Sequence, residues 1–305
     1  MAEAAIAVRG LRKSYGKHEA VRGIDFEVQR GEVFGFLGPN GAGKTTTIEI
    51  LEGYRDRTGG DVSVLGVDPG RPTRAWRNRV GFVLQESEPD PTLTVRETLT
   101  LYASFYTSPR SVDEIIELVG LKDKADARMG TLSGGQKRRA DVGIGIVGDP
   151  ELIFLDEPTT GFDPSARRGA WNMIQGLKQL GKTIFLTTHY MDEAQHLADR
   201  VVILRQGQIV AQGEPDELGG GMGSASEVRF RVPEGVTIEQ LQKIVREKLD
   251  ASGGEVSFRT DNAQKALFEL TGWAERQHVQ LADLEVQRPT LEDIFLQLTQ
   301  EQPES

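Results

Sequence analysis

The feature that most constrains this chain is a glycine-rich octapeptide, Gly38-Pro-Asn-Gly-Ala-Gly-Lys-Thr45, which fits the pattern G-x-x-x-x-G-K-[ST]. It follows the apolar stretch 32–37 and opens a helical pattern over 44–53. Its glycines allow backbone N–H groups to converge on an anion at the start of that helix. A chance glycine-rich turn would lack this strand–turn–helix context. The segment therefore predicts a P-loop that binds nucleotide phosphates.

In such a loop Lys44 neutralises the β- and γ-phosphates, and the Thr45 hydroxyl binds Mg²⁺. We expect the phosphate contacts to come from Gly38, Pro39, Asn40, Gly41, Ala42, Gly43, Lys44, Thr45 and Thr46.

A second apolar stretch, 152–155, ends in the acids Asp156 and Glu157. Beside a P-loop, Asp156 suits Mg²⁺ binding, and Glu157 is then free to polarise a water that attacks the γ-phosphate. Because strands commonly end in acids, this pair alone would not indicate a function, and the functional interpretation depends on the P-loop. Together the two segments predict hydrolysis of the nucleotide.

The segment Leu132-Ser-Gly-Gly-Gln136 introduces a helical run that begins at Lys137. Ser133 followed by Gly134 and Gly135 starts a helix with exposed N–H donors, and the helix dipole adds to their attraction for an anion. An ordinary N-cap is the alternative. Because the chain already holds one phosphate site, an economical hypothesis is a head-to-tail dimer, in which this helix end caps the nucleotide of the other subunit.

The pattern of strands and helices predicts an α/β fold. Apolar strands at 32–37, 151–156 and 183–187 alternate with helices, which is typical of a parallel sheet covered on both faces. The stretches 6–9 and 24–28 alternate polar and apolar residues, as half-buried antiparallel strands do. We expect helices at 44–53, 164–180 and 190–198, and a closing hairpin at 201–204 and 208–211.

A Gly/Ser-rich stretch suggests that the chain has two domains. It predicts a main domain at 1–218, a flexible linker at 219–226 and a small α+β domain at 227–305. In the last of these we expect strands at 227–232, 255–260, 266–271 and 284–287, and helices at 237–249, 272–280 and 290–299.

Composition excludes several classes of function. The 36 basic and 46 acidic residues give a net charge of −10, which disfavours a nucleic-acid partner. The chain has no cysteine, so disulfides and thiolate catalysis are excluded. No apolar run approaches the roughly 20 residues of a spanning helix, and the start lacks a basic leader. We therefore expect a cytoplasmic protein whose membrane role, if any, comes through a partner.

The P-loop at 38–45, Leu-Ser-Gly-Gly-Gln at 132–136 and Leu-Asp-Glu-Pro at 155–158 resemble, in that order, the ATP-binding subunit of an ABC transporter. The resemblance covers about residues 3–218. It implies a P-loop NTPase fold with an antiparallel β subdomain and a helical subdomain, and ATP and Mg²⁺ as ligands. It also implies a second ATPase subunit, expected to be another copy of this chain, and an integral membrane permease that holds the dimer at the inner face of the cell membrane.

The resemblance also implies roles for four residues outside these motifs. Tyr15 would stack on adenine, and Gln85 would reach magnesium and sense the permease. Asp163 would communicate across the dimer, and His189 would contact the γ-phosphate. Taken alone, each has an ordinary structural alternative, and their order relative to the three motifs favours the functional one. Phe162 replaces the family's usual leucine, a change that should not touch the chemistry.

The tail ends in Pro-Thr-Leu-Glu-Asp-Ile-Phe at 289–295, a helix that Thr290 would cap with Asp293 three residues on. This ending resembles the bacterial drug-export ATPases that include the daunorubicin resistance subunit, in which the tail helps to hold or regulate the dimer. The resemblance favours export of a drug or of another hydrophobic or lipid-like compound. An importer subunit, a soluble ABC ATPase of translation or DNA repair, and a subunit that no longer hydrolyses ATP are the alternatives.

Overall fold

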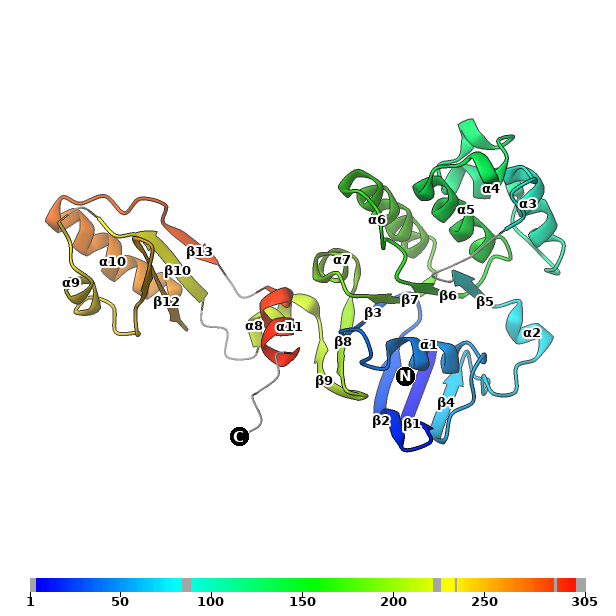
Figure 1. The fold of residues 1–305 in the computed structure, drawn as a ribbon, viewed down its shortest axis with the longest axis horizontal. Helices are drawn as coiled ribbons and strands as arrows, with labels where there is room; N and C mark the ends of the chain where they lie inside the picture. Colours follow the sequence, from blue (N-terminus) through cyan, green and yellow to red (C-terminus); the bar gives the residue numbers. More distant parts are fainter. Residues whose placement is uncertain (1–3, 84–88, 222–225, 234, 288–289, 300–305) are drawn as a thin grey trace. The chain divides into compact units, whose positions relative to one another are not determined.

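The computed structural model describes residues 4–83, 89–221, 226–233, 235–287 and 290–299. The chain divides into two compact units, one of residues 1–215 with 298–305 and one of residues 216–297 (Figure 1). Each unit has its own sheet system and its own apolar core, and the two are described separately.

A six-stranded sheet forms the centre of the first unit, in the order β5-β6-β7-β3-β8-β9. Neighbours from β5 to β8 run parallel, and β9 pairs antiparallel with β8. The strands are β3 (Val33–Leu37), β5 (Val80–Val83), β6 (Leu152–Asp156), β7 (Thr183–Thr188), β8 (Arg200–Arg205) and β9 (Gln208–Gly213). This confirms the predicted α/β class, the buried parallel strands and the closing hairpin.

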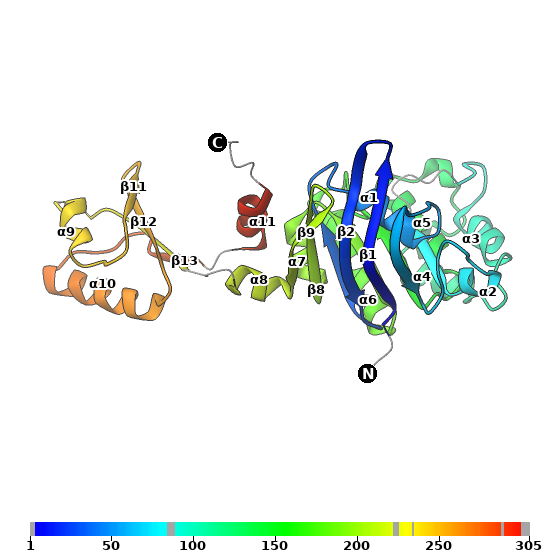
Figure 2. The ribbon, with the colours of Figure 1, turned by 90° about the horizontal axis from the view of Figure 1, so that it is seen from below.

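A second, antiparallel sheet with the order β2-β1-β4 packs in the same unit (Figure 2). It consists of β1 (Ile6–Tyr15), β2 (His18–Val28) and β4 (Gly59–Val64). Apolar residues from this sheet and from helix α1 (Lys44–Leu51) form one core with Phe34, Phe154 and Phe185 of the central sheet. The alternating patterns at 6–9 and 24–28 therefore correctly predicted parts of β1 and β2, whereas β4 was not predicted.

Helices cover the opposite face of the central sheet, where Ile153, Ile184 and Leu186 join a second core. Because successive strand residues enter different cores, the parallel strands are apolar throughout. The helices that contribute to this core are α3 (Val95–Ala103), α4 (Val112–Leu118), α5 (Gly134–Ile146), α6 (Pro164–Gln179) and α7 (Met191–Leu197), with short 3₁₀ turns at Lys122–Lys124 and Met129–Thr131. Helices α3, α4 and α5 contact one another and form the predicted helical subdomain. Helix α2 (Arg74–Arg77) instead contributes Trp76 to the first core.

The second unit is a small α+β fold around a four-stranded antiparallel sheet, β11-β12-β10-β13. Its core includes Val228, Phe230, Phe258 and Leu270. The elements from 226 onward are β10 (Ser226–Arg231), α9 (Ile238–Gln242), β11 (Asp250–Ser252), β12 (Glu255–Thr260), α10 (Ala263–Gln277), β13 (Glu285–Gln287) and α11 (Leu291–Thr299). The capping pair of α11 is as predicted: the Asp293 carboxylate accepts from the Thr290 amide at 2.7 Å.

Two elements of this unit differ from the prediction. The strand expected at 266–271 is part of α10, because the Asn262 side chain caps the helix by accepting from the Lys265 amide, and Ala266, Leu270 and Ala274 recur on one buried face. The helix expected at 237–249 stops at Gln242. The side-chain amide of Gln242 donates from Nε2 to the backbone carbonyls of Val245 and Glu247 and holds the chain in a turn.

The predicted linker also begins later than expected. Helix α8 (Pro215–Gly221) extends through residues 219–221, since a proline at its first position and the acids Asp216 and Glu217 in its first turn favour a helix start. Residues 222–225 lie outside the described ranges, and Ser226 begins β10. Across the part of the chain that the structure describes, no helix is long and apolar enough to cross a membrane.

Candidate functional site

The order of the central sheet brings the predicted site segments together. Strand β7 lies between β3 and β6, and all three run parallel. Their carboxyl ends therefore meet at one edge of the sheet, where α/β proteins bind ligands. The P-loop follows β3, Asp156 and Glu157 end β6, and His189 follows β7.

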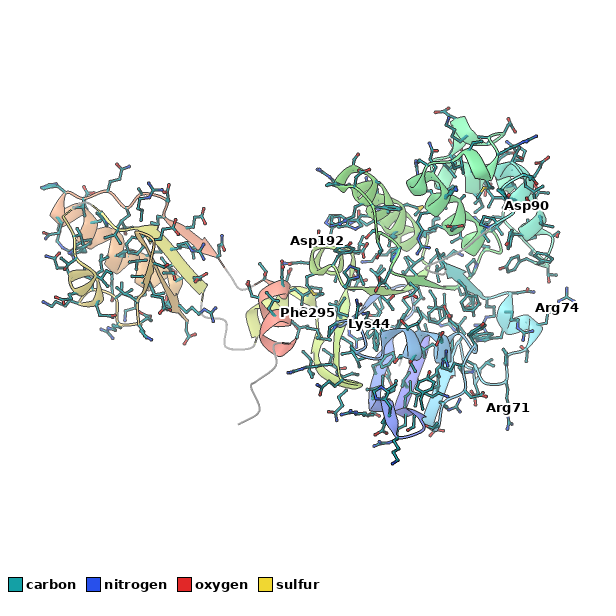
Figure 3. All side chains as sticks on the ribbon, viewed as in Figure 1. Lys44, Arg71, Arg74, Asp90, Asp192 and Phe295 are labelled. Carbon is teal, nitrogen blue, oxygen red and sulfur yellow. The ribbon has the colours of Figure 1, made fainter. Side chains whose placement is uncertain are left out.

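Lys44, labelled in Figure 3, is the first residue of α1 and is buried. Its Nζ donates to the carbonyl of Gly38 at 2.7 Å and to that of Pro39 at 3.3 Å. Burial lowers the pKa of this ammonium, and the nearby carboxylates of Glu157 and Asp156 oppose that shift. A poorly hydrated cation held among carbonyls is well placed to exchange them for phosphate oxygens.

The loop needs glycine at two of its positions because the chain approaches itself closely there. A Cβ at Gly38 would lie 2.5 Å from the Leu204 carbonyl oxygen, and a Cβ at Gly43 would lie 2.5 Å from that of Ala20. Gly43 also has a φ of 107°, which side chains rarely adopt. Asn40, Gly41 and Thr45 are exposed, so this face of the loop is open to a ligand.

Asp156 and Glu157 have different environments. The Asp156 carboxylate accepts a hydrogen bond from the hydroxyl of Thr187 on β7, and burial raises its pKa. The Glu157 backbone has a φ of 44°, in the left-handed region, and its amide donates to the Thr187 carbonyl and hydroxyl oxygens, each at 3.1 Å. The strand end therefore directs one carboxylate inward and sets the other in a constrained turn.

Three polar groups surround the Glu157 carboxylate. Its Oε1 lies 4.0 Å from Lys44 Nζ, and its Oε2 lies 3.3 Å from Nδ1 of His189 and 3.1 Å from the Thr160 hydroxyl, which donates to it. Lys44, Glu157 and His189 line one cavity of about 540 Å³ together with Thr45 and Tyr15. The cavity thus joins a cation, a carboxylate and an imidazole around the P-loop.

Tyr15 lies at the end of β1 and is 41% exposed. The Arg55 guanidinium and the Lys13 ammonium lie 5.4 Å and 5.1 Å from its ring centre. The ring therefore presents an accessible aromatic surface to the P-loop cavity. Gln85, the other residue expected near magnesium, lies outside the described residues.

The second predicted anion site lies at the start of α5. Ser133 is its N-cap and forms a capping box with Gln136, whose amide donates to the Ser133 hydroxyl at 3.3 Å while its side chain accepts from the Ser133 amide at 3.0 Å. No heavy atom lies within 4 Å of a Cβ placed on Gly134. The helix start is therefore open at Gly134, whereas a Cβ on Gly135 would lie 3.7 Å from Cβ of Ala166.

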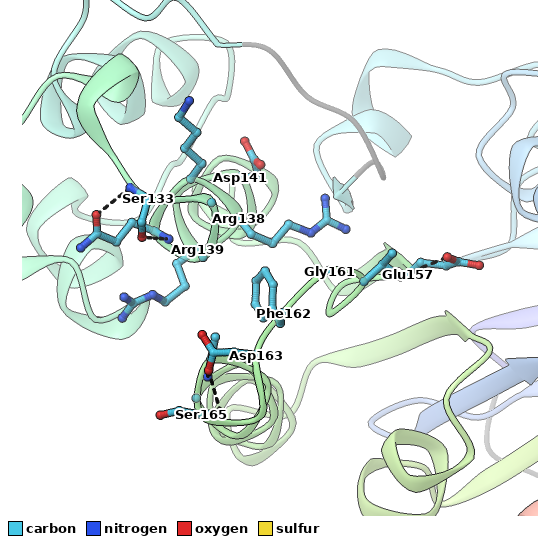
Figure 4. A pocket seen from close by; sticks show the side chains of 16 residues that line it. Ser133, Arg138, Arg139, Asp141, Glu157, Gly161, Phe162, Asp163 and Ser165 are labelled. Carbon is cyan, nitrogen blue, oxygen red and sulfur yellow. Dashed lines mark hydrogen bonds between the residues drawn. The ribbon is translucent and has the colours of Figure 1, made fainter.

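Asp163 caps the neighbouring helix α6, and its carboxylate accepts from the amides of Ser165 and Ala166 at 2.8 and 2.9 Å. It lines a cavity of about 1010 Å³ with Ser133, Gly135 and Glu157 (Figure 4). Two cavities thus adjoin Glu157 in one copy of the chain. The first contains the P-loop, and the second contains the open end of α5.

Two buried charged residues at this edge belong to no sequence motif and were not predicted. Arg138 of α5 donates to the carbonyls of Asp156 and Pro158. Glu193 of α7 is fully buried and accepts from the Thr159 hydroxyl at 2.8 Å and from the Trp171 indole at 3.1 Å. In the sequence each of these residues is only a charged residue within a helical pattern, and neither is part of a motif that indicates a buried role.

The oxygen donors present suit Mg²⁺, which proteins hold with one or two carboxylates while the nucleotide supplies further oxygens. Asp156 offers a partly buried carboxylate, and Thr45 is an exposed residue with a hydroxyl. Among the described residues, no group of three or more His, Cys, Asp or Glu side chains could hold a metal by itself. The residues therefore fit a magnesium ion that is bound partly by the protein and partly by the phosphate oxygens of a nucleotide.

Comparison with known proteins agrees with this geometry. Residues 21–160 match the family model described as ABC transporter, and residues 226–290 match one described as ABC transporter domain-containing protein-like, C-terminal domain. The Nod factor export ATP-binding protein I of Rhizobium sp. (strain N33) is 38% identical, over 98% of each chain. The linearmycin resistance ATP-binding protein LnrL of Bacillus subtilis (strain 168) is 34% identical, over 96% of this chain and 98% of the relative.

Solved structures show the same fold in the first unit. The ADP conformation of MJ1267, an ATP-binding cassette of an ABC transporter, superposes with a TM-score of 0.64 and 25% identity, over 70% of this chain and 92% of that one. For cbiO1 from Clostridium perfringens, part of the ABC transporter complex cbiONQ, the TM-score is 0.64 and the identity 27%, over 72% and 92% of the two chains.

Proposed function

The chain belongs to the ATP-binding subunits of ABC transporters, and from this we propose that it hydrolyses MgATP in a head-to-tail dimer that drives export through a separate membrane permease. One observation carries the proposal: Lys44, Glu157 and His189 surround the P-loop cavity, while the open end of α5 lines a different cavity. A nucleotide held by one P-loop would need a second copy of the chain to meet such a helix end.

The residues at the sheet edge divide the work of hydrolysis. Glu157 accepts a proton from the water that attacks the γ-phosphate in line, while Lys44 and His189 stabilise the charge that builds on the phosphate oxygens. Asp156 and Thr45 would hold Mg²⁺, with Gln85, and the ion would neutralise further phosphate charge. Tyr15 stacks on the adenine ring.

The second subunit completes each site. Ser133, Gly134, Gly135 and Gln136 offer the helix start that would meet the γ-phosphate from across the dimer, and Asp163 lies beside it. Binding of two MgATP molecules therefore closes the dimer, and hydrolysis removes the γ-phosphate and reopens it. We infer that the small second unit helps to hold or regulate this dimer.

The direction of transport follows from the relatives, which are named for Nod factor export and for linearmycin resistance. We infer a drug or another hydrophobic or lipid-like compound as the cargo, selected by the permease. The chain would then work at the inner face of the cell membrane.

Purification from native membranes tests the partner directly. The full chain is tagged, the membranes are dissolved in mild detergent, and the proteins that co-purify are identified, with the Lys44→Ala chain as a nucleotide-binding control. We expect a stoichiometric polytopic membrane protein that raises the ATPase rate of the wild-type chain and not of the variant. Recovery with ribosomal or DNA-associated proteins and without such a partner would contradict the transport role.

A further inference from the structure

Arg138 connects helix α5 to the strand end that carries Glu157. Its side chain is buried, and its guanidinium donates from Nη2 to the Asp156 carbonyl at 2.8 Å and from Nε to the Pro158 carbonyl at 3.2 Å. Figure 4 shows the side chain extending from the helix toward this segment. The two carbonyls belong to the residues immediately before and after Glu157, so the guanidinium brackets the glutamate through its backbone.

These two hydrogen bonds flank a residue with a strained backbone conformation. Glu157 has a φ of 44°, which costs free energy for a residue with a side chain. Such a conformation persists only where the surroundings determine it. On the β7 side the Glu157 amide bonds to Thr187, and on the α5 side Arg138 holds the flanking carbonyls. The direction of the Glu157 carboxylate therefore depends on contacts from both sides.

We propose that Arg138 is a positioning residue for ATP hydrolysis, which fixes the backbone on either side of Glu157 and thereby aims its carboxylate at the attacking water. This inference rests on the proposed role of Glu157. The hydrogen bonds from Nη2 and Nε of Arg138 go to the carbonyls of residues 156 and 158, and neither carbonyl belongs to the P-loop. Loss of Arg138 should therefore reduce turnover and leave nucleotide binding in place.

The test compares steady-state ATPase kinetics of the full chain with Arg138→Gln, Arg138→Lys and Arg57→Gln. Arg57 is the matched control, since it also donates from Nε to a backbone carbonyl, that of Gly60, at 2.9 Å, and it lines neither of the two cavities beside Glu157. We expect Arg138→Gln to lower kcat by about a hundredfold, the size of effect that a small misplacement of a reacting group produces. The KM for MgATP should stay within about twofold, because the P-loop contacts are unchanged.

Lysine at position 138 keeps the charge and lacks the planar fork that reaches both carbonyls. Arg138→Lys should therefore have a kcat between those of Arg138→Gln and the wild type. If Arg138→Gln does not fold, the kcat of Arg138→Lys relative to the wild type provides the test. Arg57→Gln should keep the wild-type kcat. Equal kcat in the folded Arg138 variants and the wild type, or a loss confined to KM, would overturn the inference.

Glu157→Gln in the same assay separates this inference from its premise. If Glu157→Gln hydrolyses ATP as fast as the wild type, the proposed role of the glutamate fails and the inference fails with it. If Glu157→Gln is nearly inactive and both Arg138 variants are fully active, only the role of Arg138 is overturned.

Discussion

Glu157 is held in position by its backbone as much as by its side chain. Its left-handed φ turns the chain away from β6, and contacts from β7 and α5 hold that turn. The carboxylate then lies within 4.0 Å of both Lys44 Nζ and the imidazole of His189. An acidic residue at the end of a strand becomes a useful base only when such contacts limit where it can move.

Another carboxyl near the P-loop helix predicts a dependence of stability on pH. Burial, together with the charges of Asp156 and Glu49, raises the pKa of Glu52 from 4.5 to about 8. Because the folded pKa exceeds the unfolded one, the stability that this group contributes is complete below pH 4.5 and is lost as the pH rises toward 8. We expect the Tm of Glu52→Gln to match that of the wild type near pH 4.5 and to exceed it by several degrees at pH 8.

Thermal unfolding of the nucleotide-free chain across this range measures the effect. Glu49→Gln is the control, since it lies one turn earlier in α1 and loses an ion pair with Arg55. That variant should be less stable than the wild type. A constant difference in Tm between Glu52→Gln and the wild type at all pH values would contradict the account.

At this scale the sequence predicted residues that belong to motifs and missed residues that only hold them. The P-loop, the Ser-Gly-Gly start of α5 and the acids after β6 follow from residue type and spacing, and in the structure the P-loop and the α5 start line two cavities that share Glu157. Arg138 and Glu193 could not be recognised. Their partners come from segments distant in sequence or are backbone carbonyls, and any residue can supply a carbonyl.

Helix α5 packs unusually close to strand β5, and glycines make that possible. A Cβ at Gly145 would lie 2.6 Å from a methyl carbon of Val83 and 2.9 Å from the Phe82 carbonyl oxygen, and a Cβ at Gly81 would lie 2.2 Å from the Gly145 carbonyl oxygen. Gly145 therefore allows close packing against β5, which offsets the poor helix propensity of glycine. This contact fixes the helix that carries Ser133 and Arg138 against the sheet.

Alanine substitutions test this contact. Gly145→Ala should lower the free energy of unfolding by about 1–3 kcal/mol, because the added methyl forces the helix and strand apart. Gly176→Ala, in α6, makes the same change where no heavy atom lies within 4 Å of the new carbon. It should raise the free energy of unfolding by about 0.5–1 kcal/mol. Denaturant unfolding measures both, and a stabilising Gly145→Ala would show that the close approach is not required.

In the first unit, β3, β6 and β7 could be predicted because these buried strands are apolar throughout and the loops after β3 and β6 carry motifs. Strands β4 and β5 and helices α2 to α4 carry no such signal and were not predicted. The elements of the second unit were harder to predict. Residues 266–271 contain several apolar side chains in a short run, which suits a strand as well as a helix. The Asn262 cap and the i, i+4 spacing of Ala266, Leu270 and Ala274 favour the helix. In that helix Phe268 lies on the outer face and is 77% exposed. The side-chain bonds of Gln242 that end α9 follow no sequence rule.

At the scale of the whole molecule, the two units have separate cores, and the P-loop belongs to the first. A ligand that binds only the folded form stabilises the unit that binds it, by about 2.7 kcal/mol at a hundred times its Kd. Calorimetry of the Glu157→Gln chain should therefore show one transition that MgATP moves to higher temperature and one that it leaves in place. Lys44→Ala should abolish the shift, and joint movement of both transitions would contradict the independence of the units.

We expect two copies of the chain to enclose MgATP between the P-loop of one and the α5 start of the other. The mass of the Glu157→Gln chain in solution, measured by light scattering with and without MgATP, tests it most directly. We expect the 33.5 kDa monomer alone and twice that mass with MgATP, and we expect Ser133→Arg to prevent the change while ATP still binds. A chain that stays monomeric with saturating MgATP, or a dimer that forms without nucleotide and tolerates Ser133→Arg, would contradict the account.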